Sequence, residues 1–247
     1  MGLRSKILLA ATGLLLAILA VAAAVASARS DPAPDKEAAL PDLRPLPPAD
    51  LRVEEDEDEK ILRFSNTVWN AGDGPLEVRG EPSASGETLV TQAVHLEDGG
   101  TEEREVGKFV HHDDHDHWHV EDFALYELRS IRPGGEVGSV VASSGKVSFC
   151  IIENTEVDGH LVSEHREKWE YGGCGDETQG ISPGWGDTYG ASVSGQKLSI
   201  EAVPDGRYAL RSVADPENRF AESDPDNNGA IVYLQIDGDE VEEIDEK

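Results

Sequence analysis

The chain has 247 residues and a formal net charge of −29, from 50 acidic and 21 basic side chains. An acidic excess of this size argues against nucleic-acid binding, which depends on Lys and Arg patches facing the phosphates. It favours cationic partners attracted by the long-range field of the protein, although adaptation to salt explains the same excess equally well.

The first 28 residues have the pattern of an export signal. Arg4 and Lys6 precede an apolar stretch over residues 7–26, and an A-x-A sequence at 26–28 fits a cleavage site. The stretch is about 20 residues long, which is enough to span a bilayer if it is not cut. The sequence therefore predicts an exported protein, either secreted after cleavage or held at the cell surface through this segment alone.

The remaining chain divides into a polar linker at 29–39, one domain at 40–236 and an acidic tail at 237–247. We expect the tail and the acidic run at 54–59 to be solvated and mobile. Within the domain, short segments rich in β-branched and aromatic residues alternate with Gly, Pro and Asn turns. We expect strands at 60–69, 75–79, 88–96, 120–128, 146–153, 198–203, 207–214 and 230–236. No amphipathic helix of ordinary length follows the leader, so the predicted fold class is all-β, an Ig-like sandwich with long irregular loops.

Residues 154–188 are rich in glycine and are predicted to form a long irregular loop, which in a compact domain is usually functional. The two cysteines, Cys150 and Cys174, lie on either side of part of this loop. In an exported chain an even number of cysteines usually pairs, so we expect a disulfide. Two thiolate metal ligands are the alternative.

Five of the eight histidines lie within residues 111–119, just before the strand predicted at 120–128. His115, His117 and His119 alternate, so on a strand their side chains would share one face. His115 and His119 would be about 13 Å apart on a straight strand, so one ion needs a bent or bulged strand to bind all three. Imidazoles suit copper, zinc or nickel, with copper(II) bound most tightly.

Other interpretations of this stretch remain open. A hydrated loop rich in His and Asp is the simplest, and we assign His111 and His112, which flank Asp113 and Asp114, to such a loop. A non-catalytic exported copper-binding β-sandwich module would need only the three alternating histidines. A zinc hydrolase with a metal-bound water as nucleophile is a third interpretation.

Five separate motifs then occur in order: HDHWHVEDFALYEL, GKVSFC, QGISPGWGDTY, VPDGRYALRSVADP and ESDPDNN. In order and spacing they resemble the catalytic domain of the lysyl oxidase family, over about residues 40–236. The short, cysteine-poor chain is similar to a prokaryotic member.

The resemblance implies a copper-dependent amine oxidase, similar to protein-lysine 6-oxidase. Such an enzyme uses dioxygen to convert a primary amine or a lysine side chain to an aldehyde, with release of ammonia and hydrogen peroxide. It also implies that His115, His117 and His119 bind copper, and that Lys146 and Tyr189 cross-link into lysine tyrosylquinone. From the residues alone, Lys146 would be an exposed strand residue and Tyr189 a loop aromatic.

The catalytic base is less clearly marked. Animal members of the family have a histidine shortly after the copper strand that has been proposed for this role, and Leu125 lies close to that place here. We predict Asp187, two residues before Tyr189, as the substitute. A turn or capping aspartate is the alternative.

A second metal site is predicted near the end of the domain, where AESDPDNN brings oxygen-bearing side chains together. Oxygen ligands suit calcium. The resemblance implies that this segment and the entry to the domain form a calcium site, and a polar hairpin turn is the alternative. The predicted ligands are Asp42, the Leu43 carbonyl, Glu222, Asp224, Asn227 and Asn228.

Overall fold

The computed structural model describes residues 38–246, except for 83–86, 97–98, 114–115 and 166–169. The predicted export signal, most of the predicted linker and His115 therefore lie outside the described residues. In the part that is described, no helix has the length and hydrophobicity needed to cross a bilayer.

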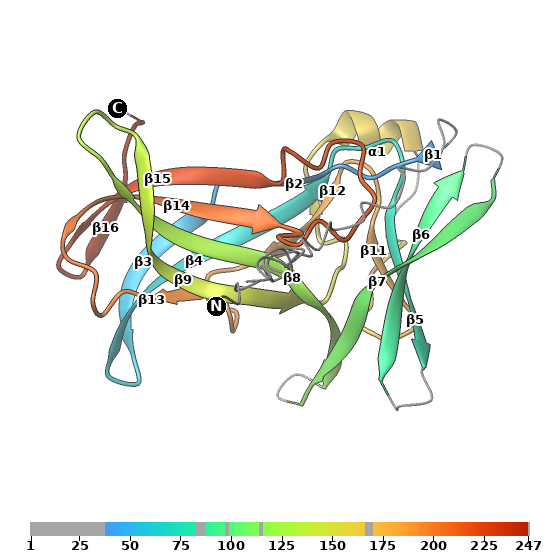
Figure 1. Cartoon of the computed structure of the whole chain (residues 1–247), viewed down its shortest axis with the longest axis horizontal. Helices are drawn as coiled ribbons and strands as arrows, with labels where there is room; N and C mark the ends of the chain where they lie inside the picture. Colours follow the sequence, from blue (N-terminus) through green and yellow to red (C-terminus); the bar gives the residue numbers. More distant parts are fainter. Residues whose placement is uncertain (1–37, 83–86, 97–98, 114–115, 166–169, 247) are drawn as a thin grey trace, which may run out of the picture. The chain divides into compact units, whose positions relative to one another are not determined.

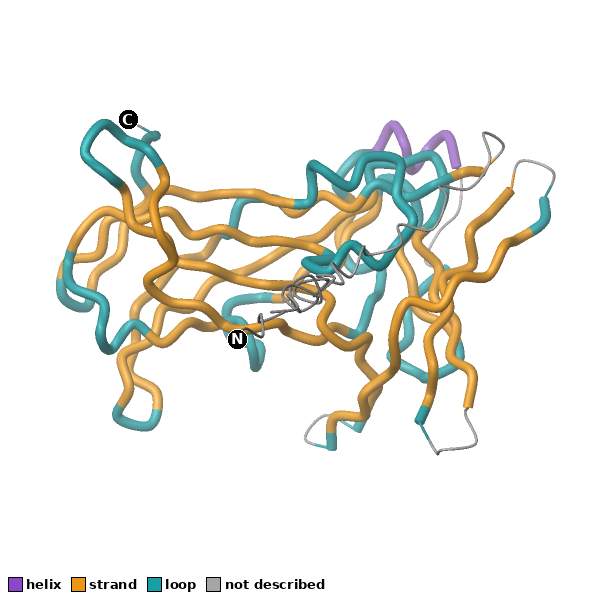
Figure 2. The backbone as a smooth tube through the Cα atoms, in the orientation of Figure 1, coloured by secondary structure: helices purple, strands orange, loops and turns teal. Residues whose placement is uncertain are grey.

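The described residues form two antiparallel sheets and one short helix (Figures 1 and 2). The larger sheet has the order β11-β5-β6-β7-β8-β14-β15-β16, with β1 beside β6 and β9 beside β8. The smaller sheet has the order β10-β12-β4-β13, and β2 and β3 also pair with β4. The elements are β1 (Ala38–Ala39), β2 (Leu43–Pro45), β3 (Ala49–Asp56), β4 (Glu59–Asn70), β5 (Leu76–Pro82), β6 (Thr88–Leu96), β7 (Thr101–His112), β8 (His117–Ile131), β9 (Val137–Phe149), β10 (Thr155–Glu156), α1 (Gly159–His165), β11 (Thr178–Ile181), β12 (Trp185–Tyr189), β13 (Lys197–Ser199), β14 (Gly206–Ala214), β15 (Gly229–Asp237) and β16 (Glu240–Glu243).

The core lies between the two sheets, which confirms the predicted all-β sandwich. Phe64 of β4 and Tyr126 of β8 are fully buried and meet edge to face, with ring centroids 4.8 Å apart. The Tyr126 hydroxyl accepts a hydrogen bond from Gln196 Nε2 at 3.0 Å, so its buried polar atom has a partner. Burial of each large apolar side chain of this kind stabilises the fold by about 1.5–3 kcal/mol.

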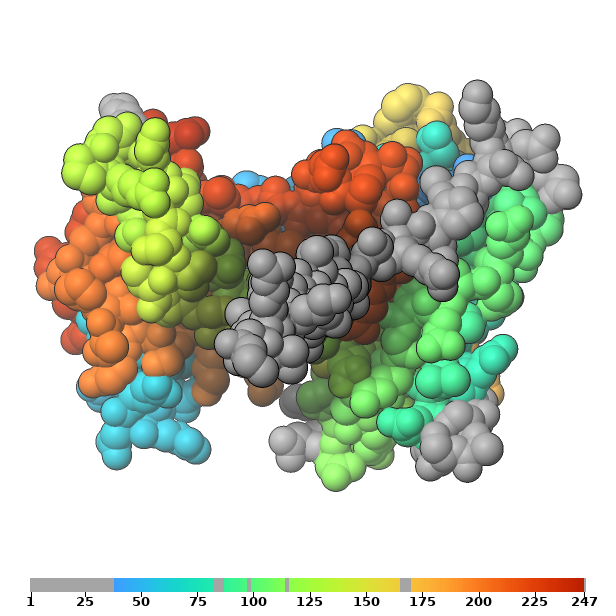
Figure 3. Space-filling view, in the orientation of Figure 1, coloured from blue at the N-terminus to red at the C-terminus, as the bar shows by residue number. Residues whose placement is uncertain are grey.

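Most predicted strands are confirmed, with changed ends. β4, β6, β14 and β15 match the strands expected at 60–69, 88–96, 207–214 and 230–236. The strand expected at 146–153 overlaps only the last four residues of β9, which begins at Val137 and ends at Phe149, so residues 150–153 are not part of a strand. Its turn with β8, at 132–136, projects from the surface in Figure 3 (yellow-green).

The two acidic runs are largely exposed, as expected, but both contribute strands, which a mobile segment would not form. Residues 54–56 belong to β3, which pairs with β4 across a turn where Glu57 and Asp58 have φ values of 53° and 66°. Basic partners offset the charge, since Arg63 pairs with Glu54 and Lys197 lies 2.6 Å from Asp56. In the tail, β16 pairs with β15.

The segment at 154–188 is more ordered than predicted. It contains β10, α1, β11 and β12, and α1 begins after Asp158, whose Oδ1 accepts hydrogen bonds from the backbone of His160 and Leu161 at 2.9 and 3.3 Å. β11 pairs with β5 of the larger sheet, whereas β12 pairs with β4 of the smaller sheet. The segment therefore contacts both sheets and carries Asp187 and Tyr189 into the domain.

Candidate functional site

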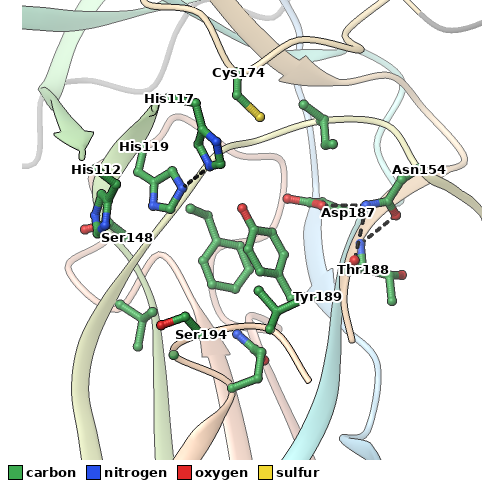
Figure 4. A pocket seen from close by; sticks show the side chains of 16 residues that line it. His112, His117, His119, Ser148, Asn154, Cys174, Asp187, Thr188, Tyr189 and Ser194 are labelled. Atoms are coloured by element: carbon green, nitrogen blue, oxygen red, sulfur yellow. Dashed lines mark hydrogen bonds between the residues drawn. The ribbon is translucent and has the colours of Figure 1, made fainter. Parts of the chain in front are cut away.

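A pocket of about 310 Å³ lies among the ends of β7, β8 and β9, strand β12 and the segment at 193–196 (Figure 4). The predicted disulfide, Cys150 to Cys174, is confirmed, and Cys174 lines this pocket. The Cys174 carbonyl accepts a hydrogen bond from the Trp118 backbone at 2.9 Å, which fixes the loop against β8. The lining residues that carry chemistry are His112, His117, His119, Asp187 and Tyr189.

Three of the histidines gather on one wall of the pocket. His117 and His119 alternate on β8, and their Nε2 atoms are 2.8 Å apart. β7 pairs with β8 so that His112 lies directly opposite His117, and the ring centroids of His112 and His119 are 4.2 Å apart. Figure 4 shows the three rings side by side above Tyr189.

The sequence interpretation of His112 as a solvated loop residue was wrong. His112 ends strand β7 and is only partly exposed. The signal that could have identified it is the short spacing between His112 and His117, since a hairpin between them places the two residues opposite each other. His111 does lie at the surface, where its ring meets Trp118 at 5.0 Å and Nδ1 lies 2.9 Å from Asp113.

The described histidines fit a copper ion in one respect. Two nitrogen ligands at about 2.0 Å from one ion, set at right angles, lie about 2.8 Å apart, as in the tetragonal geometry of copper(II). The Nε2 atoms of His117 and His119 have this separation. Within the described residues, which omit His115, no group of three or more His, Cys, Asp or Glu side chains forms a metal-binding set.

Tyr189 is the last residue of β12, and hydrogen bonds and ring stacking hold its side chain in place. Its hydroxyl donates to the Cys150 carbonyl at 3.0 Å and accepts from the Cys150 N–H at 2.9 Å. Its ring stacks on Phe149 with centroids 4.1 Å apart. Burial, together with the nearby Asp187 carboxyl, raises the pKa of Tyr189, so the side chain is a neutral phenol.

Lys146 does not meet Tyr189 in this structure. It lies on β9, but it is not among the described residues that line the pocket. Its Nζ lies 2.6 Å from Asp122 Oδ2 and 2.6 Å from Glu217 Oε1. Hydrogen bonds to Asp122 and Glu217 raise the pKa of Lys146, so the side chain is held as an ammonium group.

Asp187 lies within β12 opposite Val68 of β4, so it is a strand residue and the turn alternative is wrong. The side chain is fully buried, and Oδ1 accepts a hydrogen bond from Asn154 Nδ2 at 3.0 Å. Oδ2 is buried and has no hydrogen-bond partner among the described residues. Burial raises the pKa of Asp187 well above its ordinary value.

The predicted calcium ligands come together where the chain enters the domain. Glu222 Oε2 accepts from the Leu43 N–H at 2.6 Å, and Glu222 Oε1 accepts from Asn228 Nδ2 at 2.7 Å. Burial raises the pKa of Glu222 to about 8. Among these predicted ligands, three buried oxygens have no hydrogen-bond partner within the described residues: Asp42 Oδ1, Asn227 Oδ1 and Asn228 Oδ1.

Asp224 differs from the other predicted calcium ligands in its exposure. It is exposed, and its carboxylate accepts hydrogen bonds from the Asp226 backbone at 3.2 Å and from Asn227 Nδ2 at 3.0 Å. Buried oxygens without hydrogen-bond donors, beside a half-buried carboxyl, are the chemistry that a hard cation would satisfy.

Comparison with known proteins places these residues in a family. A sequence model described as lysyl oxidase matches residues 100–245, more than half of the chain. Lysyl oxidase homolog 2 from Homo sapiens is 34% identical over 131 residues, which cover 53% of this chain and 15% of the relative. Lysyl oxidase homolog 1 from Homo sapiens is 34% identical over 118 residues, 47% of this chain and 18% of the relative. The chain thus spans less than a fifth of the length of these curated relatives.

Proposed function

The chain belongs to the lysyl oxidase family, and we propose that it is a copper-dependent amine oxidase. The reaction converts a primary amine or a lysine side chain to an aldehyde, consumes dioxygen, and releases ammonia and hydrogen peroxide. The observation that carries this proposal is the 2.8 Å pair of Nε2 atoms on His117 and His119, which open into the same pocket as Tyr189.

The residues that would hold copper are His117 and His119, with His115 as the third ligand, and His112 lies beside them. Bound copper would supply dioxygen chemistry next to Tyr189, and lysine tyrosylquinone made from Tyr189 and Lys146 would supply the carbonyl that oxidises the amine. The Cys150 backbone and the Phe149 ring hold the Tyr189 ring in one orientation. A ring fixed in this way loses little freedom when it reacts.

Asp187 is the proton acceptor that we propose for the substrate. It lines the same pocket as Tyr189 and comes from the same strand, two residues earlier. A carboxyl whose pKa is raised well above its ordinary value by burial is suited to accept a proton and return it. Asn154 donates its hydrogen bond to Oδ1, so Oδ2 remains to accept the substrate proton.

The proposed substrate is cationic, a primary amine or a lysine-containing polypeptide, because the protein carries a net charge of −29. We propose that the protein is exported, and either secreted or anchored at the cell surface by its N-terminal segment. No nucleic acid takes part in the proposed function, and membrane contact occurs only through that segment.

We also propose that the cluster around Glu222 binds calcium as a structural ion. The ligands are the side chains of Asp42, Glu222, Asp224, Asn227 and Asn228 and the Leu43 carbonyl. An ion there would neutralise the half-buried Glu222 carboxyl and satisfy the three buried oxygens. It would also join the start of the domain to the segment that precedes β15.

Visible absorption of copper-loaded, air-exposed protein tests the enzyme assignment. We expect a quinone band that needs copper, and we expect Tyr189→Phe to remove the band while copper is still bound. The position of Lys146 outside the pocket favours one alternative, a non-catalytic copper-binding module. Stoichiometric copper binding without a band in the unaltered protein would support that alternative.

A further inference from the structure

Lys146 takes part in a cluster of four charged side chains that we call the Lys146 clamp: Lys146, Asp122, Glu217 and Arg219. The Lys146 ammonium lies 2.6 Å from each of the two carboxylates. Arg219 Nη2 lies 3.2 Å from the same Asp122 oxygen and 2.7 Å from Glu217 Oε2. The clamp therefore ties β9 to β8 and to the turn that follows β14, and each carboxylate is shared by two cations.

The backbone of β8 is irregular at the place where the clamp forms. β8 pairs with β9 at Val120–Phe149 and again at Ala124–Val147, so four residues of β8 span the distance of two on β9. Asp122 lies inside this bulge with φ 59°, a left-handed conformation that Asp and Asn adopt more readily than other residues. Because Asp122 lies in the bulge, it is outside the regular pairing of β8 with β9, and its side chain can contact Lys146.

The clamp holds Lys146 in a state that cannot react with a quinone. A new bond from the Lys146 nitrogen to a ring carbon needs the lone pair of a neutral amine, whereas hydrogen bonds to Asp122 and Glu217 raise the pKa of Lys146. Tyr189 is meanwhile fixed by both polar atoms of the Cys150 backbone. A neutral amine inside the pocket would also compete with dioxygen for an open position on copper.

We propose that Asp122 and Glu217 are positioning residues that keep Lys146 outside the pocket until the Tyr189 ring is oxidised. Opening of the clamp then releases Lys146, which forms the cross-link. This inference rests on the proposed function. The oxidation balances with two molecules of dioxygen. One oxygen atom becomes the second quinone oxygen, while three hydrogens from Tyr189 and one from the neutral Lys146 amine leave as one water and one hydrogen peroxide.

The first test measures the Lys146 amine in copper-free protein, so that it does not depend on the quinone. We would pulse-label the protein with an amine-reactive ester and measure modification of Lys146 by mass spectrometry, in Asp122→Asn, Glu217→Gln and the double variant. Asn is chosen because it tolerates the left-handed backbone at 122. Labelling of Lys146 should rise about three- to tenfold in the double variant, as expected for loss of two exposed ion pairs.

Glu121→Gln is the matched control, because Glu121 precedes Asp122 in the chain but lies 3.5 Å from Lys108. It should leave the labelling of Lys146 unchanged. Equal labelling of Lys146 in the double variant and the unaltered protein would overturn the proposal.

The second test adds copper and air in the presence of a fixed concentration of ethylamine, which competes with Lys146 for the oxidised Tyr189 ring. The measured quantity is the fraction of modified Tyr189 that carries Lys146 instead of ethylamine. The double variant should raise this fraction, and an unchanged or lower fraction would overturn the proposal. If Tyr189 is not oxidised in the unaltered protein, the proposed function itself fails, and the labelling result shows separately whether the carboxylates hold the amine.

Discussion

The histidine pocket and the oxygen cluster around Glu222 are two sites built by opposite means. The described histidines of the pocket come from one hairpin, and His112 and His117 are opposed because β7 and β8 pair directly. The oxygen cluster instead joins Leu43 to Glu222, which are 179 residues apart in the chain. The first arrangement leaves imidazole nitrogens facing a pocket, whereas the second places most of its oxygen atoms inside the protein.

This difference indicates different tasks. An ion in the pocket can exchange ligands with substrate and dioxygen, because the pocket is open to them. An ion in the oxygen cluster would close a contact between distant parts of the chain and so stabilise the fold. Copper at the first site and calcium at the second would then affect different measurements, and variants can separate the two.

The largest effect should come from His117→Ala. Loss of one imidazole from the 2.8 Å pair removes a ligand, so copper affinity should fall by at least about 100-fold and no quinone band should form. Isothermal titration with copper and the visible spectrum measure the two effects. His160→Ala is the control, because His160 is an exposed residue of α1 away from the pocket and its loss should change neither. Normal copper affinity in His117→Ala would contradict the site.

A narrower effect, confined to turnover, is expected from Asp187→Asn. The amide cannot accept the substrate proton, so kcat should fall by about 10²–10⁴-fold while copper content and the quinone band remain. Steady-state oxidation of a small primary amine, measured as hydrogen peroxide release, gives kcat. Turnover equal to that of the unaltered protein would show that another group is the base.

Reduction of the Cys150–Cys174 disulfide should act on both stability and the pocket, since Cys174 lines it. A cross-link over a loop of this size is expected to stabilise the fold by about 3 kcal/mol. The paired variant Cys150→Ser with Cys174→Ser should show this loss in urea unfolding. A loss below about 1 kcal/mol would mean that non-covalent contacts alone hold the loop in place.

The smallest effect is expected from calcium at the second site. Calcium at about 100 times its dissociation constant should raise the free energy of unfolding by about 2.7 kcal/mol. Glu222→Gln should abolish the increase, whereas Asp226→Asn, which alters an exposed carboxylate in the same turn, should retain it. The copper affinity of all three proteins should be equal. A melting temperature that does not respond to calcium would rule out the calcium site around Glu222.

The same contrast explains what the sequence could predict. Alternation of His117 and His119 before an apolar strand places both side chains on one face. Segments rich in β-branched and aromatic residues, bounded by turn residues, likewise predicted β4, β6, β14 and β15. β7 escaped prediction because TEEREVGKFVHH carries charges in place of an apolar alternation. His112 was missed with it, since its place in the pocket depends on the pairing of β7 with β8.

Lys146 is an exposed strand residue, as expected from the residues alone, but its ion pairs could not be predicted, for a different reason. Its partner Glu217 is 71 residues away in the chain, and Asp122 reaches it from a bulge that no local pattern marks. Interactions between distant segments of this kind are fixed only by the assembled sheets. The disulfide is the exception, because two cysteines in an exported chain have only each other as partners.

Mass spectrometry of a proteolytic digest of copper-loaded, air-exposed protein tests the assignment as an amine oxidase most directly. We predict a cross-linked peptide that contains both Lys146 and Tyr189 and is absent from protein kept free of copper. Recovery of both residues in ordinary, unlinked peptides from fully copper-loaded protein would contradict it, and a copper-binding module without amine oxidase activity would then describe the chain better.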